Sequence, residues 1–403
     1  MATDRMSSAS RRSFLNLSAA ASAALAMRIV TEPMLARAKE HHPPAGAVMI
    51  DSNENPLGPC VSAREAIADI APQGGRYLDG LTDDLVKTVA QMEGLKPDYV
   101  TVHPGSTPPL HHTVCAFTSP QRSYVTADPG FEAGMFAVRA TGARIVKVPL
   151  TKSYAHDVKA MIAAGQDAGV FYICNPNNPT GTITGHSDIE YLVENKPKGS
   201  IMLVDEAYIH FSDATSVVDL VKADKDVIVL RTFSKLFGMA GLRCGLALGR
   251  PDLLDKMYNY GGGNFMPVTA LVAASASLKH VNLVAERKKI NADIRSNVFQ
   301  WLDSNGYSYI PSQSNCFMLD TKRPAKQVID AMAKQNVFIG RIWPLMPTYS
   351  RITVGTQAEM EQFQAAFKKV MTGAATAAVS SPRPRRTQAH VDGVPVPERT
   401  GLA

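Results

Sequence analysis

Short runs in which nearly every residue is apolar recur through the middle of the chain. They predict β-strands that are covered on both faces, because strands with one wet face alternate instead. Seven such runs are Tyr99–Val102, Tyr124–Ala127, Ile145–Val148, Val170–Cys174, Ile201–Val204, Val227–Thr232 and Gly245–Leu248. Helical patterns lie between them, at Ser187–Glu194 and Asp252–Tyr258. This alternation predicts a large, doubly wound α/β domain with a mainly parallel sheet over residues 75–265.

The pattern changes after residue 265. Apolar residues at helical spacing over 269–305 predict a long helix. Two short strand patterns and a closing helix follow, at Cys316–Leu319, Arg351–Val354 and Glu359–Met371. We expect residues 46–74 and 266–372 to form a second, smaller α/β domain.

The first 38 residues differ in composition from this body. The pair Arg11-Arg12 is followed by a stretch of small apolar residues, Leu17–Met27, and then by Ala36-Arg37-Ala38. This order of charge, apolar stretch and A-x-A site is typical of a cleaved export signal. The paired arginines resemble the twin-arginine type, which predicts a periplasmic or otherwise exported protein that meets the membrane only through the export machinery. An amphipathic first helix is the alternative.

The other end, residues 373–403, is rich in Ala, Ser, Pro and Arg and is expected to be a disordered tail. The net charge of +6 is concentrated in the two ends, because residues 1–38 carry +3 and residues 373–403 carry +2. The body is left with +1, which argues against nucleic acid as a partner. Five widely spaced cysteines make neither a disulfide framework nor a zinc motif. No metal is expected at His111-His112 either, because adjacent helical residues point in different directions.

Polar motifs follow the predicted strands, at the edge where open α/β sheets bind ligands. They are Gly105-Ser106-Thr107, Asn175–Gly181, Asp205–Tyr208, Arg231–Lys235 and Leu242–Gly245. A lysine at a strand end can form a Schiff base with an aldehyde cofactor. Pyridoxal phosphate needs such a lysine, a carboxylate for its ring nitrogen and a phosphate cup. Lys235, Asp205 and the turn at Gly105–Thr107 supply one of each.

Taken together, these motifs resemble the fold-type I pyridoxal-phosphate aminotransferases of class I/II. Within that class the chain is most similar to the histidinol-phosphate aminotransferase branch, over about residues 48–370. The motifs that carry the resemblance are Asn177–Gly181, Asp205–Tyr208, Thr232–Gly245, Asn53–Gly58, Arg76-Tyr77 and Arg351–Thr356. The resemblance implies a homodimeric enzyme that transfers an amino group between an amino acid, or a related amine, and a 2-oxo acid.

The resemblance also implies roles for individual residues. Lys235 would bind the cofactor and move the proton, Asp205 would pair with the ring nitrogen, and Asn178 and Tyr208 would bind the ring oxygen. The phosphate contacts would be Gly105, Ser106, Thr107, Ser234 and Arg243, with Tyr77 reaching in from a neighbouring subunit. Phe131 would stack on the ring. On the substrate side, Arg351 would bind a carboxylate, Arg341 is a candidate for a second anionic group, and Asn55 is a further candidate.

Two segments depart from the branch. Pro108-Pro109 follow the phosphate turn where that branch usually has acidic residues, and Leu78-Asp79-Gly80 stand where it commonly has Pro-Asp. Together with the export signal, these departures argue against histidinol phosphate as the substrate. They leave the cofactor chemistry untouched. The same scaffold also serves decarboxylation, cyclisation and oxidation of amino acids, so these reactions are the alternative to transamination, and a catalytically idle binding protein is a more distant one.

Overall fold

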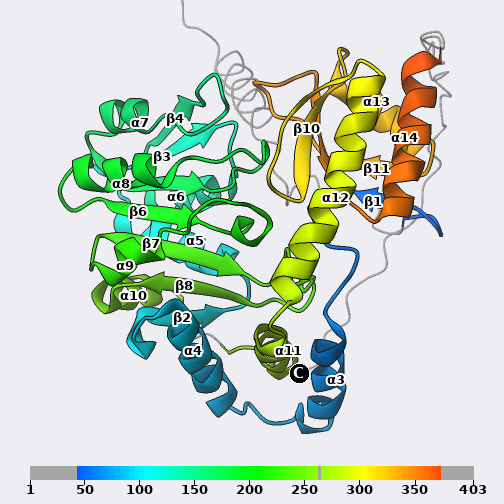
Figure 1. Cartoon of the computed structure of the whole chain (residues 1–403). Helices are drawn as coiled ribbons and strands as arrows, with labels where there is room; N and C mark the ends of the chain where they lie inside the picture. Colours follow the sequence, from blue (N-terminus) through cyan, green and yellow to red (C-terminus); the bar gives the residue numbers. More distant parts are fainter. Residues whose placement is uncertain (1–42, 262–264, 374–403) are drawn as a thin grey trace, which may run out of the picture.

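The computed structural model describes residues 43–261 and 265–373, which build two large hydrophobic cores (Figure 1). The export signal expected at residues 1–38 and the tail expected after residue 373 lie outside the described residues. The larger core surrounds a seven-stranded sheet, and the smaller core lies beside it.

All seven expected strands of the large sheet are present, with ends that differ from the prediction by at most two residues. They are β2 (Val100–His103), β3 (Ser123–Asp128), β4 (Ile145–Pro149), β5 (Ala168–Cys174), β6 (Ile201–Asp205), β7 (Val227–Thr232) and β8 (Gly245–Gly249). Their order across the sheet is β2-β8-β7-β6-β5-β3-β4. Neighbours from β4 to β7 run parallel, whereas β8 is antiparallel to both β7 and β2. The sheet is therefore mainly parallel, as predicted.

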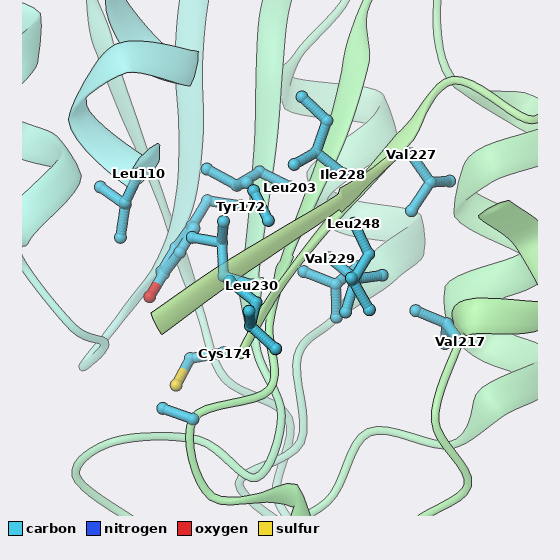
Figure 2. Packing of buried hydrophobic residues seen from close by; sticks show 14 of the residues in the cluster. Leu110, Tyr172, Cys174, Leu203, Val217, Val227, Ile228, Val229, Leu230 and Leu248 are labelled. Carbon is cyan, nitrogen blue, oxygen red and sulfur yellow. The ribbon is translucent and has the colours of Figure 1, made fainter. Parts of the chain in front are cut away.

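Helices cover this sheet in two layers, which explains why its central strands are apolar at nearly every position. The helices are α4 (Gly80–Glu93), α5 (Thr107–Phe117), α6 (Ala133–Thr141), α7 (Val158–Ala164), α8 (His186–Asn195), α9 (Val218–Lys222) and α10 (Pro251–Tyr258). In one layer α5 packs against α6, α10 and the middle of the sheet, and in the other α7 packs against α8. Figure 2 shows Tyr172, Leu203, Leu230 and Leu248 of four central strands packed in the buried cluster.

The smaller core is built from the start and the end of the described chain. Its strands are β1 (Val48–Ile50) paired with β11 (Val337–Ile339), and β9 (Ser308–Ile310), β10 (Cys316–Asp320) and β12 (Tyr349–Thr353) in a second sheet. Its helices are α12 (Leu283–Ser304), α13 (Ala325–Ala333) and α14 (Gln357–Thr372). The last helix begins at a capping box, in which Thr356 and Glu359 bind each other's backbone N–H groups.

The structure differs from the sequence prediction at two places. Helix α3 (Val61–Ile70) packs against α11 (Val268–Lys279), and both contribute buried residues to the larger core rather than to the smaller one. The single helix predicted over 269–305 is two helices, α11 and α12, bent by 86° at the break. Helical spacing identifies a helix, but it does not say which of two cores receives its apolar face.

Three short 3₁₀ helices complete the described elements, at Ala71–Gln73, Pro97–Tyr99 and Ile209–Phe211. Within residues 43–261 and 265–373, no single helix is long and apolar enough to cross a membrane. The pair α11 and α12 reaches that length and composition only when the two are taken together across their bend.

Candidate active site

A cavity of about 180 Å³ opens where the carboxyl ends of β5, β6 and β7 meet. Its volume is several times the share of one water molecule, about 30 Å³, so it has room for a larger ligand. Ten of the predicted site residues line it: Ser106, Thr107, Phe131, Asn178, Asp205, Tyr208, Ser234, Lys235, Arg243 and Arg351. The large sheet brings most of these residues together because its parallel strands end at one edge, whereas Arg351 comes from β12 of the smaller core.

Asp205 is the last residue of β6 and is only 2% exposed. Its Oδ2 accepts a hydrogen bond of 2.9 Å from the hydroxyl of Tyr172, and its Oδ1 accepts one of 3.1 Å from the backbone N–H of Ala207. Burial raises the pKa of Asp205 to about 6, while these two bonds and the nearby Lys235 act in the opposite direction. A carboxylate held this way at the base of a cavity is suited to pair with a cationic ring nitrogen.

Lys235 follows the end of β7 and reaches the same cavity. Its Nζ donates hydrogen bonds to the carbonyl oxygens of Asn53, at 3.1 Å, and of Ser52, at 3.5 Å. The ammonium lies 5.7 Å from the centre of the Tyr208 ring. The tyrosine hydroxyl accepts hydrogen bonds from the side-chain amides of Asn53, at 3.0 Å, and Asn178, at 3.5 Å. The amine and the phenol therefore face one space, as a cofactor that binds both requires.

The predicted phosphate turn lies at the N-terminus of α5. Pro108 and Pro109 have no N–H, and the N–H of Leu110 already donates to the carbonyl oxygen of Ser106. Within the first turn, only the N–H of Thr107 can therefore bind an anion, beside the hydroxyls of Ser106 and Thr107. Arg243 closes the turn from the other side, because its Nη1 lies 3.3 Å from Oγ of Ser234 and its Nη2 lies 3.3 Å from the carbonyl oxygen of Pro104. Gly105 has a φ of +92°, and a Cβ there would lie 2.1 Å from Nη2 of Arg243. The positive φ favours glycine at this position, and the absence of a side chain leaves room for the guanidinium of Arg243 beside the turn.

Arg351, on β12, is buried and brings the smaller core to the cavity. Its Nη1 donates to Oδ1 of Asn178 at 2.9 Å, and its Nη2 donates to the carbonyl oxygen of Asp51 at 2.7 Å. Its guanidinium also lies 5.6 Å from the centre of the Trp343 ring. These contacts fix the plane of a guanidinium that can bind a carboxylate with two parallel hydrogen bonds.

Four predicted residues are not part of the cavity lining. Gly105 lies behind it and shapes the turn, as described above. Asn55 donates to the carbonyl oxygen of Leu236 at 2.8 Å and lines a separate hollow of about 20 Å³, too small for a substrate. Tyr77 is 74% exposed on the surface. Arg341 forms an ion pair with Glu132 instead of pointing freely into the cavity.

Sequence reasoning missed several residues that support the site. Tyr172 and Trp343 are buried side chains with a polar group, and such groups almost always have a hydrogen-bond partner. That rule predicts that each side chain has a hydrogen-bond partner, but it does not identify the partner. Glu132 and the carbonyl groups of Ser52 and Asn53 carry no signal in the sequence, because their contacts come from distant segments.

These features together fit pyridoxal phosphate. The buried Asp205 suits the ring nitrogen, Lys235 supplies the amine, and the turn before α5 with Arg243 suits the phosphate. Asn178 and Tyr208 line the same cavity and contact each other, so both could bind the cofactor's ring oxygen.

Comparison with known proteins agrees with this reading. Residues 47–367 match the model of the family "Aminotransferase class I and II". The histidinol-phosphate aminotransferase of Moorella thermoacetica is 30% identical over 333 residues, covering 80% of this chain and 85% of the relative. The aromatic amino acid aminotransferase of Cutibacterium acnes is 31% identical over 331 residues, covering 81% and 93%.

Among solved structures, the histidinol-phosphate aminotransferase of Sinorhizobium meliloti in complex with pyridoxal-5'-phosphate matches with a TM-score of 0.76 and 26% identity. The match covers 85% of this chain and 95% of that one. The fold is therefore that of the fold-type I enzymes. The chain belongs to the class I and II aminotransferases and is an enzyme that transfers amino groups with pyridoxal 5'-phosphate as its cofactor.

Proposed function

We propose that this enzyme moves the amino group of a carboxylate-bearing amino acid to a 2-oxo acid, with Lys235 as the residue that binds the cofactor and moves the proton. The observation that carries this proposal is that Lys235, Asp205 and Arg351 line one cavity. Arg351 binds the substrate's carboxylate and thereby presents its α-carbon to the amine of Lys235. Pyridoxal phosphate, when bound, supplies the electron sink for the bond that breaks at this carbon.

The remaining lining residues hold the cofactor in place in this proposal. Ser106, Thr107, Ser234 and Arg243 bind its phosphate, and Phe131 packs on its ring. Asn178 connects the two halves of the site, because its Oδ1 accepts from Arg351 while its amide donates to the hydroxyl of Tyr208. Binding of a substrate carboxylate at Arg351 is thus linked to the ring oxygen through one side chain.

A half-reaction without acceptor tests the reaction type. The purified holoenzyme, mixed with an amino acid in the absence of a 2-oxo acid, should release one equivalent of the matching 2-oxo acid per active site and then stop. Adding an acceptor should restart turnover. Release of carbon dioxide, or consumption of oxygen in step with the amino acid, would instead identify one of the alternative reactions of this scaffold.

The proposed active form is a homodimer. Two aromatic rings support it: Tyr77 is 74% exposed and Phe265 is 73% exposed, and their ring centres lie 5.4 Å apart. Leu57 and Val61 are exposed as well. Exposed apolar side chains of this size are typical of an interface. In a dimer, Tyr77 would reach the phosphate turn of the neighbouring subunit.

Sedimentation at the assay concentration tests the dimer. The active species should have twice the mass of the chain, and Tyr77→Ala should weaken cofactor binding by about tenfold, because it removes one hydrogen bond to a charged group. Tyr191→Ala, at another exposed tyrosine, is the control. A fully active monomer would contradict the proposal.

The proposed location is outside the cytoplasm, reached by twin-arginine export. The pair Arg11-Arg12 and the A-x-A site at Ala36-Arg37-Ala38 support it. All five cysteines, which lie in the described part of the chain, are free, so folding before export needs no oxidising compartment. Replacing both arginines by lysine should retain the protein in the cytoplasm. Periplasmic accumulation of that double variant, or a mature protein that still begins at Met1, would refute this location.

A further inference from the structure

An ion pair joins the two cores beside the cavity. Glu132, at the start of α6 in the larger core, pairs with Arg341, which follows β11 of the smaller core. The two side chains are only 24% and 10% exposed. Partly buried, hydrogen-bonded pairs of this kind are costly to break, because separation leaves one charge without its partner.

Trp343 ties this pair to the substrate side of the cavity. The guanidinium carbon of Arg341 lies 4.3 Å from the centre of the Trp343 ring, and that of Arg351 lies 5.6 Å from the same centre. The indole N–H of Trp343 donates to the carbonyl oxygen of Gly130 at 3.2 Å. Arg341 is therefore a neighbour of the guanidinium that we assign to the substrate carboxylate.

Glu132 is also next to the cavity. It directly follows Phe131, which lines the cavity and packs where the cofactor ring would be. The Glu132–Arg341 pair thus lies just outside the cavity lining, next to Phe131 in the chain and on the same indole ring as Arg351.

The net charge beside the cavity depends on Glu132. The lining carries three cationic side chains, Lys235, Arg243 and Arg351, against the two carboxylates of Glu54 and Asp205. A fourth cation at Arg341 would attract a phosphate or a second carboxylate on the substrate. Glu132 neutralises that fourth charge and would also repel an incoming anion at the same place.

We propose that the Glu132–Arg341 pair sets the substrate class, selecting amino acids with an uncharged side chain and discriminating against a phosphate-bearing amino donor. This inference rests on the proposed function, because it assigns Arg351 to the substrate carboxylate. In this proposal Glu132 is a positioning residue, because it acts through its ion pair with Arg341. It follows that Arg341 is not the ligand of a second anionic group that the sequence suggested.

The wild-type holoenzyme is first assayed with the twenty standard L-amino acids and with L-histidinol phosphate, each with the same set of 2-oxo acids. The best donor should have an uncharged side chain. L-Aspartate and L-glutamate, which keep the α-carboxylate that Arg351 binds and add a second anionic group, should be at least about tenfold poorer in kcat/KM. If none of these compounds were a donor, the proposed function would fail. If an acidic amino acid were the best donor, only the inference about the pair would fail. If L-histidinol phosphate, which has no carboxylate, were the best donor, the assignment of Arg351 to a substrate carboxylate would fail as well.

Glu132→Gln then tests the pair itself. It should raise kcat/KM for L-histidinol phosphate at least about tenfold, mainly through KM, and change the value for the best neutral donor by less than about threefold. Glu132→Asp should restore the wild-type preference, and Glu190→Gln, on the exposed face of α8, is the matched control.

The double variant Glu132→Gln/Arg341→Gln separates the effect of Arg341 from a general loosening of the site. The gain with L-histidinol phosphate should disappear in it, because the released guanidinium is gone. Since Arg351 is intact in all these proteins, its contribution cancels in the comparison. A gain that persisted in the double variant, or no gain in Glu132→Gln, would overturn the proposal. If Glu132→Gln did not fold, Arg341→Gln alone would serve as the test. L-Histidinol phosphate should be no better a donor for this variant than for the wild type, and an improvement would overturn the proposal.

Discussion

The hydroxyl of Tyr172 donates a hydrogen bond of 2.9 Å to Oδ2 of Asp205. The two residues belong to neighbouring parallel strands, β5 and β6, and both are buried. The other carboxylate oxygen accepts from the backbone N–H of Ala207. Between them, these two donors fix the carboxylate's plane and favour its ionised form against the effect of burial. Tyr172 is thereby a positioning residue for the group that we assign to the cofactor's ring nitrogen.

Tyr172→Phe should raise the pKa of Asp205 above its value of about 6 in the cofactor-free protein, because it removes a bond to the charged form. A hydrogen bond to a charged group contributes about 1.5 to 3 kcal/mol, so kcat should fall by about tenfold to a hundredfold. The acid limb of the pH–rate profile should move to higher pH. Tyr191→Phe serves as the control. A lower kcat with an unmoved acid limb would show that Tyr172 acts only through packing.

Asp205→Asn should make the cofactor-free protein more stable near neutral pH. The folded-state pKa of Asp205, about 6, lies above its ordinary value of 3.8, so folding favours the protonated form. The stability that this group contributes is present below about pH 4 and is lost as the pH rises through about 6. Asparagine stays neutral and avoids this loss. Urea unfolding should show a gain of about 2 to 3 kcal/mol at about pH 8 and almost none at about pH 4. An equal gain at both values would rule out ionisation as its cause.

The large sheet and most of the cavity could be predicted from the sequence for one physical reason. Strands covered on both faces must be apolar along their whole length, so β5, β6 and β7 stand out as continuous runs. Polar residues directly after such runs, among them Asp205 and Lys235, must then lie at the ligand edge of the sheet. The apolar run therefore identifies the strand, and the polar motif after it identifies the end of the strand that faces the ligand.

What the sequence did not predict depends on contacts between distant segments. Glu132 and Arg341 are 209 residues apart, and neither belongs to a motif that names the other as a partner. The position of α11 is a similar case, because its apolar residues suit either core equally well. Helix α11 packs against α3, which lies about 200 residues away in the chain, and this contact places α11 in the larger core.

Lys235→Ala should abolish turnover while leaving the fold intact. The amine is the group that we assign to binding the cofactor and moving the proton. It donates hydrogen bonds to two backbone carbonyls, and the side chain does not belong to either of the two large hydrophobic cores. We expect kcat to fall by at least about a thousandfold, with an unchanged far-UV circular dichroism spectrum. Lys152→Ala, at an exposed lysine away from the cavity, is the control. A Lys235→Ala rate within tenfold of wild type would remove Lys235 from this role.

Arg351→Ala should lower kcat/KM for the amino donor by about a hundredfold or more, because a charge-assisted, two-pronged hydrogen bond to a carboxylate is lost. Arg351→Lys should recover little of this, since an ammonium cannot reproduce the planar fork that Asn178 and the carbonyl of Asp51 hold in position. The dissociation constant of the cofactor should stay within about tenfold of wild type, because the residues that we assign to its phosphate, ring nitrogen and aldehyde are unchanged. Arg144→Ala, at an exposed ion pair with Asp167, controls for loss of a surface charge. Removing the carboxylate from the substrate must have the same effect as removing the arginine. A wild-type enzyme that used an amino acid and its decarboxylated amine equally well would therefore exclude Arg351 as the carboxylate-binding residue, whatever the variants did.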